Sequence, residues 1–147
     1  MADLRITAGP LVFGARFERE RAPRTCAAFE TLLPFTATLL QARWSGEAAW
    51  VPLGELRLPV PPENVTSYPA PGQLLFYPGG VSEAELLVPY GGTCFASRMG
   101  QLAGNHFLTI TSGAEQLDEL GRRALWEGAQ QIVIERSGYP ATPATAT

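Results

Sequence analysis

The side chains best suited to binding or chemistry lie between Leu39 and Leu53, in the run LLQARWSGEAAWVPL. This run predicts two short strands joined by Ser45-Gly46, because glycine tolerates the positive φ of a tight two-residue turn. On one face of the predicted hairpin the cross-strand neighbours are Arg43 with Ala48 and Gln41 with Trp50. A guanidinium beside an indole can bind an anionic or polar group, so the sequence predicts a ligand site beside this hairpin.

The predicted site combines a donor, two aromatic walls and a polar rim. Arg43 is the donor to an anion or a carbonyl, Trp50 and Tyr77 are the walls, and the rim comes from a later strand. The full set of predicted ligand-binding residues is Arg43, Glu47, Trp50, Tyr77, Arg98, Asn105 and His106.

Arg43 also has a purely structural alternative, as the ion-pair partner of Glu47 or of another carboxylate. A tight Ser45-Gly46 turn places Glu47 on the opposite sheet face from Arg43, which favours the site. Replacing Arg43 with alanine is therefore expected to leave folding nearly intact and to remove the ligand. Two interpretations of Arg98 stay open, a second contact to an anion and a solvated charge. Two also stay open for each tryptophan, a ligand contact and an anchor in the core or at an interface.

No metal site or cofactor is predicted. His106 is the single histidine and no cysteine-rich motif accompanies it, so a hydrogen-bonded rim or core residue is the favoured interpretation. Cys26 and Cys94 match neither zinc nor redox spacing, which predicts reduced thiols. Cys26 is expected to be buried on the face of a helix.

Two further patterns are interpreted as ordinary surface and turn structure. Glu83 and Glu85 alternate with Ala84 and Leu86, which predicts a strand with a solvated acidic face. The glycine pairs at 79–80 and 91–92 are expected to be turns, because neither matches a phosphate-binding loop.

Composition excludes several classes of partner. The 147 residues include 11 basic and 14 acidic side chains, a net charge of −3, which gives no basic field for nucleic acid or an anionic membrane. The first residues contain no apolar run long enough for a signal peptide or a membrane span, so a cytoplasmic protein is expected.

The expected elements are mostly short strands separated by turns. Strands are predicted at 4–7, 11–18, 73–77, 84–90, 95–99, 106–111 and 132–135, besides the central hairpin, with an edge strand or loop at 55–62. Helices are predicted at about 22–33, ended by Pro34, and at 115–130, capped by Ser112 or Thr111. Strands at intervals of about ten residues are typical of a small antiparallel barrel or sandwich.

The order of elements resembles that of cyclophilins. Ala22-Pro23-Arg24-Thr25 with Phe29 matches their first helix, and the run AGNHFLTI at 103–110 is similar to their NGSQFFI strand. Over about residues 3–137, with segments such as ARWSGEAAW and YPAPGQLLFYPGG, the chain is similar to a family of small bacterial cyclophilin-like proteins without an assigned function. The resemblance implies a mainly β fold, a closed antiparallel cyclophilin-like β-barrel with two helices, as a single domain over 1–137 followed by a solvated tail over 138–147.

Three functions stay open. The first is binding of a small molecule or peptide beside the 39–53 hairpin. The second is an enzyme, either a peptidyl-prolyl isomerase or one that uses His106 as a base with Glu47 or Arg43 as partners. Arg43 and Trp50 can fill two isomerase roles, but the FMxQGGDF pattern has no counterpart. The third is a subunit of a homodimer or larger oligomer, with the tryptophans and the 115–130 helix at the interface.

Overall fold

The computed structural model describes residues 2–138, so nine of the ten residues of the predicted tail lie outside the described residues. The strands are β1 Leu4–Ala8, β2 Leu11–Phe17, β3 Phe35–Gln41, β4 Gly46–Gly54, β5 Val65–Thr66, β6 Gln73–Tyr77, β7 Ala84–Thr93, β8 Ala96–Ser97, β9 Gly100–Gln101, β10 Gly104–Ser112 and β11 Gln130–Arg136. The α-helices are α1 Pro23–Glu30 and α2 Leu117–Trp126, and the 3₁₀ turns are η1 Arg43–Ser45 and η2 Ala114–Gln116. No helix of this described part is long and apolar enough to cross a membrane.

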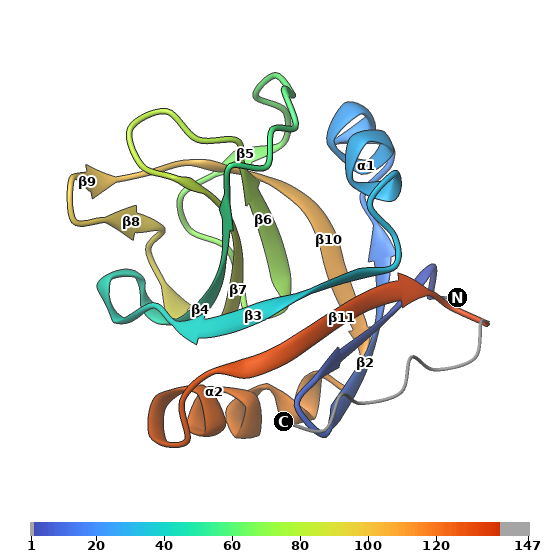
Figure 1. Cartoon of the computed structure of the whole chain (residues 1–147), viewed down its shortest axis with the longest axis vertical. Helices are drawn as coiled ribbons and strands as arrows, with labels where there is room; N and C mark the ends of the chain where they lie inside the picture. Colours follow the sequence, from blue (N-terminus) through green and yellow to red (C-terminus); the bar gives the residue numbers. More distant parts are fainter. Residues whose placement is uncertain (1, 139–147) are drawn as a thin grey trace.

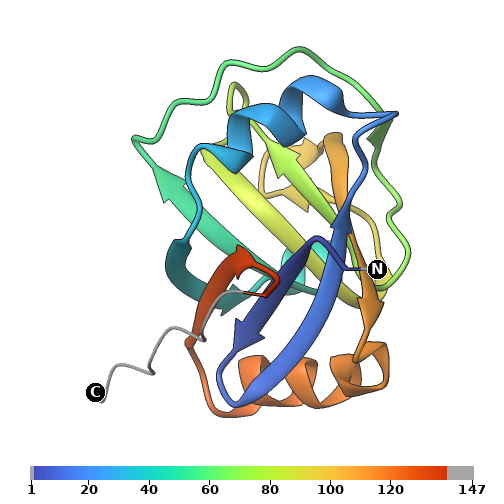
Figure 2. The ribbon, with the colours of Figure 1, turned by 90° about the vertical axis from the view of Figure 1, so that its right-hand side faces the viewer.

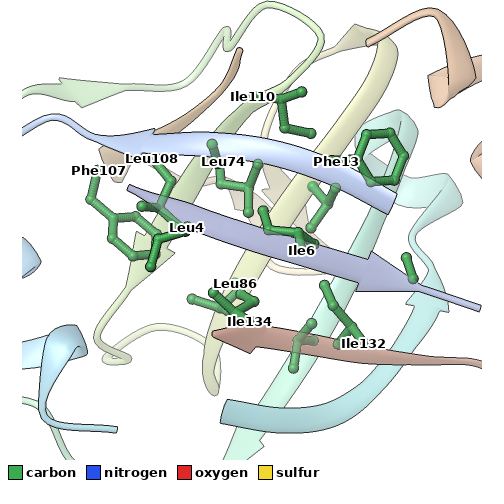
Figure 3. Close-up of a cluster of buried hydrophobic side chains, with 14 of the residues drawn as sticks. Leu4, Ile6, Phe13, Leu74, Leu86, Phe107, Leu108, Ile110, Ile132 and Ile134 are labelled. Carbon is green, nitrogen blue, oxygen red and sulfur yellow. The ribbon is translucent and has the colours of Figure 1, made fainter. Parts of the chain in front are cut away.

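Eight strands form a closed antiparallel barrel, which confirms the predicted fold class (Figure 1). Their order is β2-β1-β11-β3-β4-β7-β6-β10, and a pairing between β10 and β2 closes the ring. The alternation predicted for β2 is present: Phe13, Ala15 and Phe17 are buried, while Val12 and Arg16 are exposed. Figure 3 shows Phe13 in the barrel interior among leucine and isoleucine side chains of the neighbouring strands.

The two helices lie at opposite ends of the barrel (Figures 1 and 2). Helix α1 begins at Pro23 and buries Cys26 and Phe29, as predicted, but ends at Glu30 rather than near residue 33. Helix α2 ends at Trp126 instead of 130, because Gly128 takes a positive φ of 95° that terminates the helix. Its predicted side-chain cap is absent, and the η2 turn leads into it instead.

The central hairpin differs from the prediction by one residue of register. Leu40 lies opposite Trp50 and Gln41 opposite Ala49, and the connection is the η1 turn rather than a two-residue turn. The Ser45 hydroxyl explains the longer turn, because it donates to the Ala96 carbonyl oxygen at 3.1 Å and accepts from the Ala96 N–H at 3.0 Å. A shift of one residue changes which side chains share a face, so the predicted pairing of Gln41 with Trp50 is wrong.

Other strand boundaries also changed. Strand β7 runs through Gly91 and Gly92 to Thr93, so this glycine pair lies in a strand and not in a turn. Residues 55–62 are loop, one of the two alternatives left open, and the predicted 95–99 strand is instead part of the small β8–β9 hairpin.

The barrel wall formed by β4, β7 and β6 is covered on both faces. Leu86 points to the interior core, whereas its neighbour Leu87 belongs to a second, smaller cluster on the outer face. The residues of this outer cluster are Ala42, Ala48, Leu75, Tyr77, Leu87, Phe95 and Leu102, with Trp50 packed against them. Phe95 and Leu102 flank the β8–β9 hairpin, so the hairpin covers this part of the wall. As a result β7 buries six consecutive residues, 84–89.

Candidate functional site

The seven residues predicted to bind a ligand are divided among three places in the structure. Arg43 and Glu47 line one cavity, near helix α2. Trp50 and Arg98 line a second cavity on the outer face of the barrel wall, with Tyr77 next to it. Asn105 and His106 belong to β10 and bond to residues near α1 and β2. The structure therefore does not bring the seven side chains into one pocket.

The second cavity, called here the double-tryptophan pocket, has a volume of about 480 Å³. The residues that define it are Trp44, Trp50, Glu83, Glu85, Arg98 and Met99. Trp44 and Trp50 contact each other edge to face, with ring centroids 5.5 Å apart and an interplanar angle of 78°. Trp44 comes from the η1 turn and Trp50 from β4, so the one-residue change of register is what brings these two indoles together.

Glu85 is the unusual residue of this pocket. It lies on β7 and is only 2% exposed, so the expectation of a solvated strand face is wrong for Glu85. Its Oε2 atom has no hydrogen-bond partner among residues 2–138, and no ion pair of that part of the chain includes it. Burial, with a further contribution from the negative charge of Glu83, raises the pKa of Glu85 from 4.5 to about 8. At pH 7 this carboxyl group is therefore mostly protonated and neutral.

A signal for the burial of Glu85 was present in the sequence. Residues 83–86 alternate, but the following Leu87 and Val88 continue an apolar run instead of alternating. A strand that is apolar at consecutive positions is typical of a sheet covered on both faces. An acidic residue inside such a run lies in a buried setting whichever face it occupies.

Tyr77 positions a loop of the pocket instead of presenting its hydroxyl to a ligand. The hydroxyl oxygen accepts hydrogen bonds from the Val81 N–H at 3.0 Å and the Ser82 N–H at 3.3 Å. The ring packs edge to face on Phe95, with centroids 5.7 Å apart. Tyr77 is also the cross-strand neighbour of Glu85, so the loop between β6 and β7 is held by a residue that lies opposite Glu85 in the sheet.

The cavity that contains Arg43, called here the Arg43 cavity, has a volume of about 420 Å³. No ion pair joins Arg43 to Glu47 or to any other carboxylate within residues 2–138, and Arg43 is exposed in the η1 turn. Glu47 instead accepts a hydrogen bond from the Gly92 N–H at 3.0 Å. Arg122, which also lines this cavity, pairs with Glu119 at 2.6 Å and with Glu127 at 2.8 Å. The cavity is open and polar, without a buried polar group that lacks a partner.

Asn105 has a structural role. Its amide donates to the Thr25 hydroxyl oxygen at 3.0 Å and to the Pro61 carbonyl oxygen at 2.9 Å, and its Oδ1 accepts from the Glu63 N–H at 3.3 Å. These bonds tie β10 to α1 and to the 55–64 loop. A buried amide whose hydrogen bonds are satisfied inside the protein has little left to offer a ligand.

His106 bonds to a neighbouring hydroxyl and not to the partners proposed for it. Its Nε2 lies 2.8 Å from the Thr109 Oγ1, which donates to Glu18 at 2.6 Å. Burial lowers the pKa of His106 below its usual value, although the Glu18 carboxylate opposes that shift. Arg43 and Glu47 line the separate cavity, so the structure does not assemble the His106-centred catalytic group.

Cys26 is a buried thiol on α1, as predicted, and its Sγ lies 3.4 Å from the Phe107 carbonyl oxygen. Burial raises the pKa of this thiol to about 11, which leaves almost no thiolate at neutral pH. Cys26 and Cys94 are both free thiols. Among residues 2–138, no group of three or more His, Cys, Asp or Glu side chains could hold a metal ion.

Two solved structures share the fold. The structure of McbB in complex with tryptophan matches with a TM-score of 0.70 and 19% identity, over 95% of this chain and 46% of McbB, so the chain spans about half the length of McbB. The solution structure of the hypothetical protein AF2241 from Archaeoglobus fulgidus matches with a TM-score of 0.61 and 18% identity, over 92% of this chain and 95% of AF2241. At these identities the likeness shows the fold alone.

Sequence comparison gives a family but no activity. A search of curated proteins finds no match. The relationship to cyclophilins suggested by the sequence is not confirmed by these comparisons. The model of the family described as "Protein of unknown function (DUF3830)" matches residues 4–135, and the chain therefore belongs to the DUF3830 family.

Proposed function

We propose that this protein binds a small organic molecule in the double-tryptophan pocket. The observation that carries the proposal is Glu85, a buried carboxyl group that lines the pocket and whose Oε2 has no partner among residues 2–138. The volume of about 480 Å³ lies within the range of about 300–1,000 Å³ that is common for small-molecule sites.

The energetics of burial support this assignment. A buried polar group without a hydrogen bond destabilises a fold by about 1–3 kcal/mol, which a ligand with a matching donor or acceptor can offset. The indoles of Trp44 and Trp50 add large apolar surfaces whose N–H groups also suit ligand contacts. Arg98 and Trp50 keep the ligand-binding role predicted for them, while Glu85 replaces Arg43 as the central polar group.

An enzyme that transfers protons is the second candidate, and one observation favours it. A carboxyl group with a pKa of about 8 can both donate and accept a proton near neutral pH, as general acid–base catalysis requires. Glu85 takes the place of His106 as the candidate acid–base residue in this version. If the protein is an enzyme, the wild type is expected to bind a compound and convert it chemically. The Glu85→Gln variant is expected to bind the same compound without converting it.

The three tryptophans provide a direct test of the binding site. Trp44 and Trp50 line the proposed pocket, whereas Trp126 lines the Arg43 cavity and is 76% exposed. The indole N–H signals can be assigned with single Trp→Phe variants and followed by NMR during a screen of small molecules. Tryptophan belongs in that screen because McbB is found in complex with it.

Binding is expected to shift the indole signals of Trp44 and Trp50 and to leave that of Trp126 in place. If the compounds that bind shift only the Trp126 signal, the binding site is the Arg43 cavity and the proposal is wrong. A screen in which no compound shifts either pocket signal would also contradict it.

The remaining expectations from the sequence stay predictions. They are a single domain over residues 1–137, a cytoplasmic location, a homodimer or larger oligomer, isomerase activity as an alternative function, and no nucleic acid, membrane or cofactor as partner. The eight-strand barrel and the family match over residues 4–135 support the single domain. Light scattering at high micromolar concentration tests the oligomer.

A further inference from the structure

We infer that the ligand of the double-tryptophan pocket carries a protonated amine, which pairs with the carboxylate of Glu85. This inference rests on the proposed function and specifies the chemical class of the ligand. It follows from the charges that line the pocket and from the nature of its apolar surfaces.

On this side of the pocket, no cation of residues 2–138 pairs with Glu83 or stands ready for the ionised form of Glu85. Glu83 and Glu85 both line it, and the Glu83 charge is close enough to oppose ionisation of Glu85. Arg98 lines the same pocket, yet within residues 2–138 it forms no ion pair with Glu83 or Glu85. Arg98 is also absent from the charges that shift the pKa of Glu85. A ligand cation can supply the missing positive charge, whereas a ligand anion placed at Glu85 would add repulsion.

The other elements packed around Glu85 offer no cation either. Its cross-strand neighbours are Pro52 on β4 and Tyr77 on β6. The Tyr77 hydroxyl is already bonded to two N–H groups of the loop. The titratable or charged groups that face Glu85 are therefore Glu83, Tyr77 and Arg98, and none of them is paired with its carboxyl group in the described part of the chain.

The aromatic surfaces of the pocket favour the same class of ligand. The face of an indole attracts cations, its edge packs against the faces of other aromatic rings, and tryptophan is the strongest aromatic partner for an ammonium group. Trp44 and Trp50 contact each other at the pocket, so a ligand with an aromatic ring and an ammonium group can meet an indole and Glu85 together.

This ligand class makes binding depend on pH with a definite sign. An ammonium group pairs with the ionised carboxylate, so Glu85 must release its proton when the ligand binds below pH 8. Affinity therefore rises with pH up to about 8, by nearly tenfold between pH 6 and pH 7, and then levels off. A neutral acceptor that uses the protonated carboxyl group as a donor shows the opposite trend, with affinity that falls above pH 8.

The test uses three fragments with the same aromatic ring and different charge: 2-phenylethylamine, 2-phenylethanol and phenylacetate. The amine stays protonated between pH 6 and pH 8.5, as alkylammonium groups do. Affinities are measured from the Trp44 and Trp50 indole signals at pH 6, 7 and 8.5, for the wild type and for Glu85→Gln. Glu115→Gln is the matched control, because it removes one negative charge from an exposed position within η2.

At pH 8.5 the amine is expected to bind the wild type at least tenfold more tightly than the alcohol, with phenylacetate the weakest. Glu85→Gln is expected to lose that tenfold preference and the rise with pH, while Glu115→Gln keeps both. If the alcohol shifts the two indoles and the amine binds no better, the inference is overturned although the proposed function stands. If the amine fails to bind at all three pH values, the inference is overturned as well, and the broader compound screen then decides the proposed function.

Discussion

The barrel holds two buried glutamates on strands, and their surroundings differ in one respect. Glu135 on β11 is 4% exposed and lies opposite Arg5 on β1, with Nη2 of Arg5 3.4 Å from its Oε1. Glu85 on β7 is 2% exposed, lies opposite Tyr77 and Pro52, and borders a cavity. The carboxyl group of Glu135 therefore has a cross-strand arginine beside it, whereas that of Glu85 has a cavity beside it.

The difference separates a glutamate whose burial is compensated by an ion pair from one whose burial no partner compensates within residues 2–138. A buried ion is tolerated when a partner of opposite charge and hydrogen bonds compensate its loss of water. Glu135 has a partner of opposite charge inside the protein, the guanidinium of Arg5. Glu85 has none in the described part of the chain, and the fold accommodates it by keeping it protonated. Groups with perturbed pKa values that line a pocket are typical of binding and catalytic sites.

The largest expected effect is on the pH dependence of stability. The folded pKa of Glu85, about 8, lies above the unfolded value of about 4.5, so the folded state keeps a proton that the unfolded state loses. Stability of the wild type therefore falls as pH rises through this range, by roughly 1.4 kcal/mol per pH unit. Relative to wild type, Glu85→Gln should gain about 3–4 kcal/mol between pH 5 and pH 8 in urea melts. Glu115→Gln is the control, and a Glu85→Gln difference that stays constant with pH would remove the distinction between the two glutamates.

The second effect concerns the paired glutamate. Arg5→Met removes the cation and keeps an apolar stem, which leaves Glu135 with one fewer partner. Breaking a buried pair costs about 3–5 kcal/mol, and the partial exposure of Arg5 reduces this to about 2–3 kcal/mol at pH 7. A denaturant melt measures it. If Arg5→Met lost less than about 0.5 kcal/mol, the ion pair would not be what makes the burial of Glu135 tolerable.

A smaller effect is expected at the neighbour of Glu85. Tyr77→Phe keeps the ring packed on Phe95 and removes the hydroxyl that accepts from Val81 and Ser82. Loss of these bonds should cost about 1 kcal/mol, because water can partly replace them in this exposed loop. Amide hydrogen exchange should become faster at Val81 and Ser82 and stay unchanged at Asn105. Unchanged exchange at both loop residues would mean that the tyrosine does not position this side of the pocket.

The smallest effect is expected at Arg43, and here the structure revises the sequence-based expectation. Arg43→Ala should change the free energy of unfolding by less than about 0.5 kcal/mol, because Arg43 is exposed and makes no ion pair within residues 2–138. The sequence predicts that ligand binding is lost. The structure predicts that a ligand which shifts the Trp44 and Trp50 signals binds this variant as tightly as wild type. If Arg43→Ala instead lost tenfold in affinity for that ligand, Arg43 would be a ligand-binding residue, as the sequence predicts.

Much of the fold could be predicted because its signals are local. The alternation of Phe13, Ala15 and Phe17, and the turn residues between strands, indicate a small antiparallel barrel without any tertiary information. The hairpin register could not be predicted in the same way. It depends on Ser45, whose hydroxyl bonds to Ala96, about fifty residues away in the sequence.

The candidate site was predictable only in part for a related reason. The sequence predicts Trp50, Tyr77 and Arg98 as ligand-binding residues, because aromatic and basic residues on strands are common in binding sites. The structure places Trp50 and Arg98 in the lining of the double-tryptophan pocket and Tyr77 next to it. Glu85 was missed, because its burial depends on the β8–β9 hairpin that covers the outer face of β7. The local trace of this cover is the apolar run of Leu86, Leu87 and Val88, which is short and follows the alternating residues 83–86.

The most direct test of this account is a pH titration of the Glu85 carboxyl carbon by NMR in the ligand-free protein, with the signal assigned by its absence from Glu85→Gln. The account predicts a midpoint near pH 8, because the carboxyl group is buried beside Glu83 without a partner for its Oε2 among residues 2–138. Adding 2-phenylethylamine should lower that midpoint, since the ammonium group stabilises the carboxylate. A midpoint near pH 4.5, unchanged by the amine, would show an ordinary solvated glutamate and contradict the central claim.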